Sequence, residues 1–167
     1  MRSGTSKGQG ALWYSYIVGN TRFIVINTES DYPNAAFQPD SGTTRAGGFG
    51  DQMTWLKEQL RIANHPEERL FYPWVVVIGH RPVYSTLIKD FPANQQDRIR
   101  EWLEPLFLQY NVDMYISGHL HLYERTLPIV NNTAVQQDYH NPKGPVYVIN
   151  GAAGNVDGGE VDEIGEN

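Results

Sequence analysis

Residues 74–82 read Trp74-Val75-Val76-Val77-Ile78-Gly79-His80-Arg81-Pro82, and this stretch decides the fold that the sequence predicts. Its first five residues form a continuous apolar run, rich in β-branched side chains, between Pro73 and Gly79. A short apolar run bounded by turn residues is typical of a strand buried on both faces of a sheet. Residues 112–117 predict another short strand, and residues 146–150 predict a last buried strand. The sequence therefore predicts a sheet with several internal strands.

Two amphipathic segments separate these strands. The segment 52–64 has apolar residues at three- and four-residue spacing after Asp51, whose side chain can cap a helix, so a helix is predicted there. A second helix is predicted over 94–110, and Pro105 inside it should kink it or end its first section. Residues 12–27 predict a hairpin around Gly19-Asn20. Strands that alternate with helices indicate an α/β layer architecture.

The remaining segments are polar. Residues 28–50 and 126–144 predict surface loops, and Gly47-Gly48-Phe49-Gly50 is interpreted as a turn because it lacks the lysine of a phosphate-binding loop. Residues 157–167 contain mainly glycine and acidic residues and predict a disordered tail. The first strand is expected almost at the N-terminus, an abrupt start that suggests a fragment.

Composition limits the possible functions of the 167 residues, which are enough for one domain. The net charge of -6 and the absence of a Lys/Arg run argue against nucleic-acid binding. The absence of cysteine excludes disulfides, thiolate zinc sites and cysteine nucleophiles. No apolar stretch is long enough to span a membrane. Phosphate chemistry on so acidic a chain would need a local positive centre, for which a metal ion is the obvious candidate.

Three histidines follow predicted strands directly. His80 comes after the 74–78 run, and His119 and His121 come after the 112–117 run. Ligands gather at the carboxyl ends of strands in α/β sheets, and imidazole binds Zn, Fe and Mn. Gly79 and Gly118, which precede the histidines, are expected to allow sharp turns there. The sequence thus predicts that His80, His119 and His121 form a metal site.

Other candidates have a simpler interpretation. A single His-x-His pattern is more often a pair of ordinary loop histidines, and the metal hypothesis depends on the additional histidine at a second strand end. His65 and His140 lie in polar segments and are expected to be solvent-exposed, and Asp113 is expected to be a surface carboxylate. Asn131-Asn132-Thr133 is an N-glycosylation sequon, which matters only in a secreted glycoprotein.

The histidine motifs resemble those of a known family. Gly79-His80-Arg81-Pro82 and Gly118-His119-Leu120-His121 resemble the Gly-His-x-Pro and Gly-His-x-His motifs of calcineurin-like metallophosphoesterases. Five further segments are more specific, because they resemble sequences of the purple acid phosphatases in particular. They are the segments 52–56, 82–85, Tyr123-Glu124-Arg125, 141–145 and 150–154. The resemblance covers residues 12 to 156 in order.

This resemblance implies a fold, a reaction and a cofactor. The fold would be part of the family's four-layer α/β/β/α sandwich, with residues 1–156 as the C-terminal part of the catalytic domain. The reaction would be hydrolysis of a phosphate monoester at a dinuclear centre of Fe with Zn, Mn or Fe. His80 and His119 would bind the divalent metal and His121 the ferric one. The parent protein would be secreted or lysosomal.

The chain also departs from the family pattern. The sequence contains no Gly-Asp-x-x-Tyr and no Gly-Asn-His, motifs that carry the family's acidic, tyrosine and amide ligands. No histidine lies between His80 and His119, where many members place a substrate-facing one. The chain is therefore expected to be truncated, inactive alone and prone to self-association through exposed sheet edges.

Three functions remain open at this point. The chain could be part of a purple acid phosphatase, a non-catalytic relative that binds metal or a partner, or another metallophosphoesterase such as a phosphodiesterase. Tyr123-Glu124-Arg125 argues against the last of these.

Overall fold

The computed structural model describes residues 12–29, 52–87 and 95–154. Three expectations lie wholly or largely outside these residues. They are the loop over 28–50, including Gly47-Gly48-Phe49-Gly50, the tail over 157–167, and hence the division of the chain at residue 156. Within the described ranges, no helix combines the length and the apolar character that a membrane span requires.

The helices and strands follow the order of the sequence prediction. Their bounds are β1 Tyr14–Val18, β2 Thr21–Val25, α1 Gln52–Ala63, α2 Pro66–Phe71, β3 Trp74–Ile78, α3 Gln95–Gln109, β4 Met114–Ser117, β5 Tyr123–Arg125, β6 Ile129–Val130, β7 Thr133–Ala134 and β8 Val146–Asn150. The hairpin, the first helix and the internal strands are confirmed. The short helix α2 and the strands β5, β6 and β7 were not predicted, so the prediction of an irregular loop over 126–144 is partly wrong.

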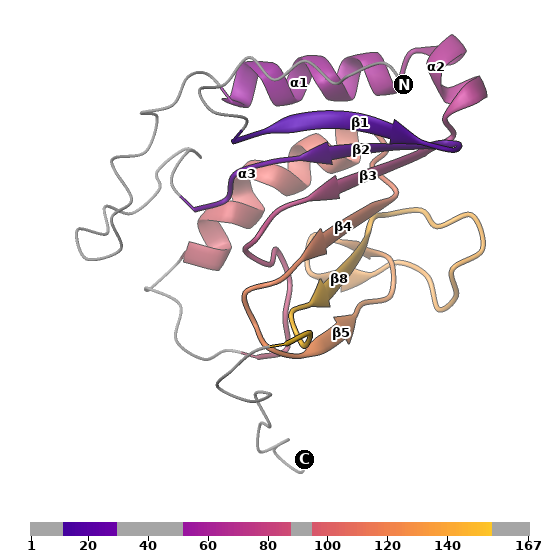
Figure 1. The fold of residues 1–167 in the computed structure, drawn as a ribbon. Helices are drawn as coiled ribbons and strands as arrows, with labels where there is room; N and C mark the ends of the chain where they lie inside the picture. The colour runs from indigo at the N-terminus through magenta and orange to yellow at the C-terminus, as the bar shows by residue number, and fades with distance from the viewer. Residues whose placement is uncertain (1–11, 30–51, 88–94, 155–167) are drawn as a thin grey trace.

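Six strands form one sheet, in the order β1-β2-β3-β4-β8-β5 (Figure 1). The pairs β2/β3, β3/β4 and β4/β8 are parallel, whereas β1 and β5 pair antiparallel at the two edges. The four parallel strands β2, β3, β4 and β8 therefore have their carboxyl ends side by side, along one end of the sheet. The small sheet β6/β7 is a separate hairpin.

One face of the sheet is covered by α1 and α3. Trp55, Leu56 and Leu60 of α1 and the apolar stripe of α3 form one buried cluster with alternate residues of the strands, including Ile24, Val77, Tyr115 and Tyr147. Figure 1 shows α3 behind the central strands and α1 above β1. Burial of these side chains, at about 25 cal/mol per Å² of apolar surface, is the main force that orders the layer.

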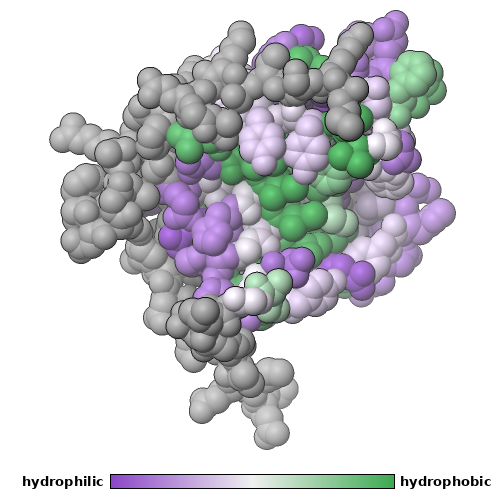
Figure 2. All heavy atoms as spheres, viewed as in Figure 1, coloured by the Kyte–Doolittle hydropathy of each residue, from purple (hydrophilic) through white to green (hydrophobic). Residues whose placement is uncertain are grey.

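The other face of the sheet is open in the described part of the chain. The apolar residues that point to this side are mostly only half-buried, and Trp74 is 48% exposed. Figure 2, viewed from the same side as Figure 1, shows apolar side chains gathered at the centre of this face. The prediction that Trp74–Ile78 is buried on both faces therefore fails at Trp74, because no described helix or second sheet covers that end of the strand.

Pro105 lies inside α3 without ending it. The helix continues through the proline to Gln109, so of the two predicted effects an end to the helix is wrong. Proline removes one hydrogen bond of the helix. Residues of the buried stripe lie on both sides of it, among them Trp102, Leu103, Leu106 and Phe107. Their packing against the sheet holds both halves of the helix in place.

A polar network joins α3 to the β6/β7 hairpin. Asn131 and Asn132 form the turn with φ values of 49° and 62°, the conformation that suits a two-residue hairpin. Their backbone N–H groups donate to Glu104 Oε1 at 2.9 Å and to Tyr84 Oη at 3.1 Å, respectively. Tyr84 Oη donates in turn to Glu104 Oε1 at 2.8 Å, and burial raises the pKa of Tyr84 to about 12.

Two tyrosines that touch each other are expected to respond differently to loss of the hydroxyl. Tyr84→Phe should lower the free energy of unfolding by about 1–3 kcal/mol, because it removes a donor from the buried Glu104 carboxylate. Tyr147→Phe should be neutral or slightly stabilising, because the buried Tyr147 Oη has no hydrogen-bond partner among the described residues. Urea unfolding followed by circular dichroism measures both, and equal losses in the two variants would contradict the assignment.

Candidate metal centre at the carboxyl ends of the strands

The three predicted ligands lie at one edge of the sheet. His80 follows β3 and His119 and His121 follow β4, and these two strands are parallel neighbours. Backbone hydrogen bonds tie the two strand ends together, from Gly79 N to Ile116 O and from Gly118 N to His80 O, each at 3.0 Å. The predicted juxtaposition of the two strand ends is confirmed.

Two of the histidine rings are in contact. The centroids of His80 and His119 are 5.1 Å apart, with the rings nearly perpendicular. The charge of His121 reaches His119 strongly enough to help lower its pKa. His119 itself has φ 67°, in the left-handed region that only a few per cent of non-glycine residues adopt. Such strain occurs most often at functional positions.

The two glycines before the histidines differ in how closely they are packed. Neither Gly79 nor Gly118 has a positive φ, and the residue in the left-handed conformation is His119. Gly79 is needed for space instead, because a Cβ there would lie 2.3 Å from Tyr115 Oη and 2.8 Å from Thr28 Cγ2. At Gly118 the nearest atom to a Cβ is His80 Nδ1 at 3.7 Å, which is an ordinary contact. The chain bends directly after both glycines, at His80 and at His119, but neither glycine adopts the left-handed conformation there.

Two charged residues that the sequence analysis did not single out complete this edge. Glu29 follows β2 and Arg81 follows His80. The Arg81 guanidinium donates to both Glu29 carboxylate oxygens, from Nε at 2.8 Å and from Nη2 at 2.9 Å, and its Nη1 lies 2.9 Å from His119 Nε2. Glu29 Oε1 is also 3.7 Å from His80 Nε2. Glu29 comes two residues after the β-rich run 21–27, and this strand-end position was the one signal for it in the sequence; the pairing of β2 with β3 is seen only in the structure.

Thr28 and Tyr115 fix the backbone beneath this cluster. Thr28 Oγ1 accepts hydrogen bonds from His80 N at 3.0 Å and from Arg81 N at 2.8 Å. Tyr115 Oη donates to Arg81 O at 2.7 Å. Burial raises the pKa of Tyr115 far above its usual value, so the hydroxyl remains a donor. The strand-end turn that carries His80 and Arg81 is thus held on both sides.

His119 is neutral near pH 7. Burial, followed by the charges of Arg81 and His80, lowers the pKa of His119 to about 4. Neutral imidazole is the form that binds metals, so the chemistry of these donors suits a metal ion. Their arrangement does not, since the described residues contain no group of three His, Cys, Asp or Glu side chains placed to hold one. The imidazole nitrogens are therefore suitable metal ligands, but the described side chains are not arranged as a complete ligand set.

Glu124 braces the segment that follows His80. Its carboxylate accepts hydrogen bonds from Thr86 N at 2.9 Å and from Ser85 Oγ at 2.9 Å. Glu124 lies on β5, opposite Ile149 of β8. The Tyr-Glu-Arg segment thus links the edge strand to the loop beyond Gly79-His80-Arg81-Pro82.

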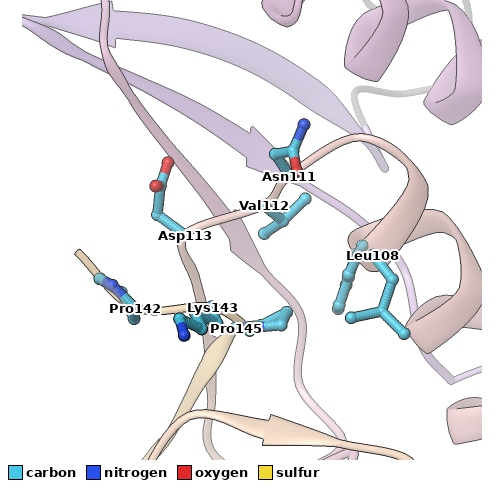
Figure 3. A pocket seen from close by; sticks show the side chains of 9 residues that line it. Leu108, Asn111, Val112, Asp113, Pro142, Lys143 and Pro145 are labelled. Atoms are coloured by element: carbon cyan, nitrogen blue, oxygen red, sulfur yellow. The ribbon is translucent and has the colours of Figure 1, made fainter. Parts of the chain in front are cut away.

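The remaining polar candidates lie elsewhere. His65 and His140 are exposed, as predicted. Asp113 is half-buried rather than on the surface, and its Oδ2 accepts from Arg69 Nη1 at 2.9 Å and from Val75 N at 2.7 Å. A hollow of ≈ 140 Å³ beside it, with Asp113, Lys143 and Leu108 in its wall, lies where β4 and β8 begin (Figure 3). This hollow is at the opposite edge of the sheet from the histidines and is separate from their site.

Comparison with known proteins identifies a family for the chain. The family described as calcineurin-like phosphoesterase matches residues 7–123. Acid phosphatase A of Cryphonectria parasitica is 34% identical over 93% of this chain and 30% of its own length. A protein of Arabidopsis thaliana described as "probable inactive purple acid phosphatase 9" is 36% identical over 86% of this chain and 19% of its own length. The chain thus spans less than a third of either relative.

A solved structure resembles the chain over most of its length. The structure of a purple acid phosphatase from yellow lupin (Lupinus luteus) seeds superposes with a TM-score of 0.64 and 27% identity, over 88% of this chain and 24% of that one. The family match includes β1 to β4 and all three histidines. The chain belongs to the calcineurin-like phosphoesterase family, and the relatives named above are described as acid phosphatases or purple acid phosphatases, one of them as probably inactive.

Proposed function

We propose that His80, His119 and His121 are metal ligands of a phosphomonoesterase centre whose acidic ligands come from outside the described residues. The supporting observation is the meeting of His80 and His119 at the ends of adjacent parallel strands, with ring centroids 5.1 Å apart. The acid phosphatase names of the relatives support a phosphate monoester as substrate. A dinuclear centre of Fe with Zn, Mn or Fe is the cofactor that the family resemblance suggests.

By itself the chain is expected to hydrolyse p-nitrophenyl phosphate negligibly at acidic pH with iron and zinc supplied. Histidines alone leave the charge of two metal ions uncompensated, and the paired Glu29 is already neutralised by Arg81. No visible absorption band should appear with ferric iron, because the ligating tyrosine of the family motif is absent from the sequence. Robust turnover that His119→Ala abolishes would show that other residues of this chain supply the missing ligands.

A chimaera tests the function itself. Residues 12–154 replace the matching segment of the Cryphonectria acid phosphatase, which supplies the rest of a catalytic domain. We expect hydrolysis of p-nitrophenyl phosphate, and a loss of at least about 100-fold in kcat/KM on His119→Ala or His121→Ala. His140→Ala, at an exposed histidine, is the matched control and should change nothing. A folded chimaera whose activity survives His119→Ala would refute the ligand assignment.

Two alternatives make different predictions in the same chimaera. A non-catalytic relative would fold and bind metal without turnover, and the name of the Arabidopsis relative gives this possibility weight. A phosphodiesterase would prefer bis-p-nitrophenyl phosphate to the monoester. The phosphomonoesterase proposal requires the opposite preference.

Secretion or a lysosomal location remains a prediction from the resemblance. If the protein enters the secretory pathway, Asn131 is placed to accept a glycan, because it is exposed at the turn of the β6/β7 hairpin.

A further inference from the structure

The Arg81 side chain is held against His119 by contacts from several directions. Its guanidinium makes a two-pronged pair with Glu29, and the arginine side chain is only 11% exposed. Its backbone is fixed by Thr28 on the N–H side and by Tyr115 on the carbonyl side. These contacts leave the Nη1 group 2.9 Å from His119 Nε2.

This contact determines which nitrogen of His119 carries the proton. A guanidinium has donors only, so Arg81 must donate and His119 Nε2 must accept. A neutral imidazole has one unprotonated nitrogen, and when that nitrogen is Nε2 the proton is on Nδ1. Both ring nitrogens are then engaged or protonated, and neither offers a lone pair to a metal ion.

We propose that Arg81 and Glu29 form a latch that closes the ligand face of His119, so that metal binds the histidines only when the guanidinium leaves Nε2. The proposal rests on the phosphomonoesterase function proposed above and adds a residue that sets the metal affinity of that site. It also gives Glu29 a second role, since its carboxylate is 3.7 Å from His80 and gains a free negative charge when Arg81 departs.

The Arg81–Glu29 pair could instead be an ion pair that only stabilises the fold. A merely structural pair would leave the His119 tautomer and the metal affinity unchanged when it is removed. Arg81→Met keeps the length of the side chain and the backbone contacts of Arg81. Glu29→Gln/Arg81→Met removes the released carboxylate as well, so any gain in affinity then comes from His119. Arg125→Met removes an equal charge from an exposed arginine that stacks on Tyr139 at 4.4 Å, and it is the matched control.

The first measurement is ¹⁵N NMR of ring-labelled histidine in the metal-depleted chain. We expect the Nδ1–H tautomer of His119 in the wild type and a shift towards Nε2–H in Arg81→Met. The Arg125→Met control should keep the wild-type tautomer. An Nε2–H tautomer in the wild type would overturn the proposal, whatever the metal affinity.

The second measurement is Zn²⁺ binding by competition with a chromophoric chelator. Loss of a hydrogen bond from a charged donor should make binding about 10-fold or more tighter in both Arg81→Met and Glu29→Gln/Arg81→Met. Adding His119→Ala should abolish the gain, and Arg125→Met should not show it. Equal affinity in the wild type and Glu29→Gln/Arg81→Met would overturn the latch. The function proposed above is judged separately, by the activity of the chimaera carrying His119→Ala.

Discussion

Gly151→Ala is expected to destabilise the chain by more than about 3 kcal/mol, or to prevent folding, although it adds a single methyl group. Gly151 follows β8, and a Cβ there would lie 2.0 Å from the carbonyl oxygen of Leu120. That oxygen belongs to the backbone of the histidine-bearing turn, which cannot move without displacing His119 and His121. Gly151 N also donates to Leu122 O at 3.1 Å, so the two segments are joined at this point.

A matched set of glycine variants separates crowding from the general effect of alanine. Gly79→Ala should also destabilise strongly, because Tyr115 and Thr28 are both buried and cannot withdraw. Gly118→Ala should cost little, since its Cβ would meet nothing closer than 3.7 Å. Thermal and urea unfolding of the three variants measures the difference. A Gly118→Ala variant as unstable as Gly151→Ala would contradict the assignment to contact with Leu120.

The purified chain is expected to sediment as a dimer or larger species at micromolar concentration. The open sheet face carries a hollow of ≈ 500 Å³ whose wall includes Phe23, Trp74, Val76 and Ile116. Monomeric proteins rarely leave a large apolar patch in water. The edge strands β1 and β5 are each paired on one side only within the described sheet, and unpaired edges add a tendency to associate.

Two double variants identify the surface responsible. Tyr14→Lys/Trp74→Lys charges the open face at side chains that are 40% and 48% exposed, so it should yield a monomer at little cost to the fold. Leu70→Lys/Phe71→Lys adds the same charge at exposed side chains of α2 and should leave the association unchanged. Sedimentation velocity compares them. A well-folded wild-type monomer would refute the prediction.

Much of the fold could be predicted because it follows from local pattern. The apolar run of β3 and the spacing of apolar residues in α1 specify a strand and a helix without reference to the rest of the chain. The short elements were missed for the opposite reason. β6 and β7 have two residues each, too few for any periodicity, and they exist because Asn131 and Asn132 turn the chain and Glu104 accepts from one of them.

The positions of the three histidines could be predicted, but their contacts could not. His80, His119 and His121 could be named because a histidine directly after a strand lies at the sheet edge whatever the packing. Glu29 and Arg81 acquire their significance from contacts across 52 and 38 residues of sequence, which no local pattern specifies. The tight packing at Gly79 was not predicted, because it depends on what lies opposite the residue, here Tyr115.

The sequence by itself determined the order of the elements, the α/β class and the position of the histidines at the ends of β3 and β4. It could do so because strand and helix periods are short-range properties of the chain. The tertiary structure alone decided that β2, β3, β4 and β8 end side by side, that Gly151 has to leave room for Leu120, and that Arg81 points at His119 rather than at solvent. Those features depend on the direction of side chains from separate strands, which is fixed only when the sheet assembles and α1 and α3 bury its inner face.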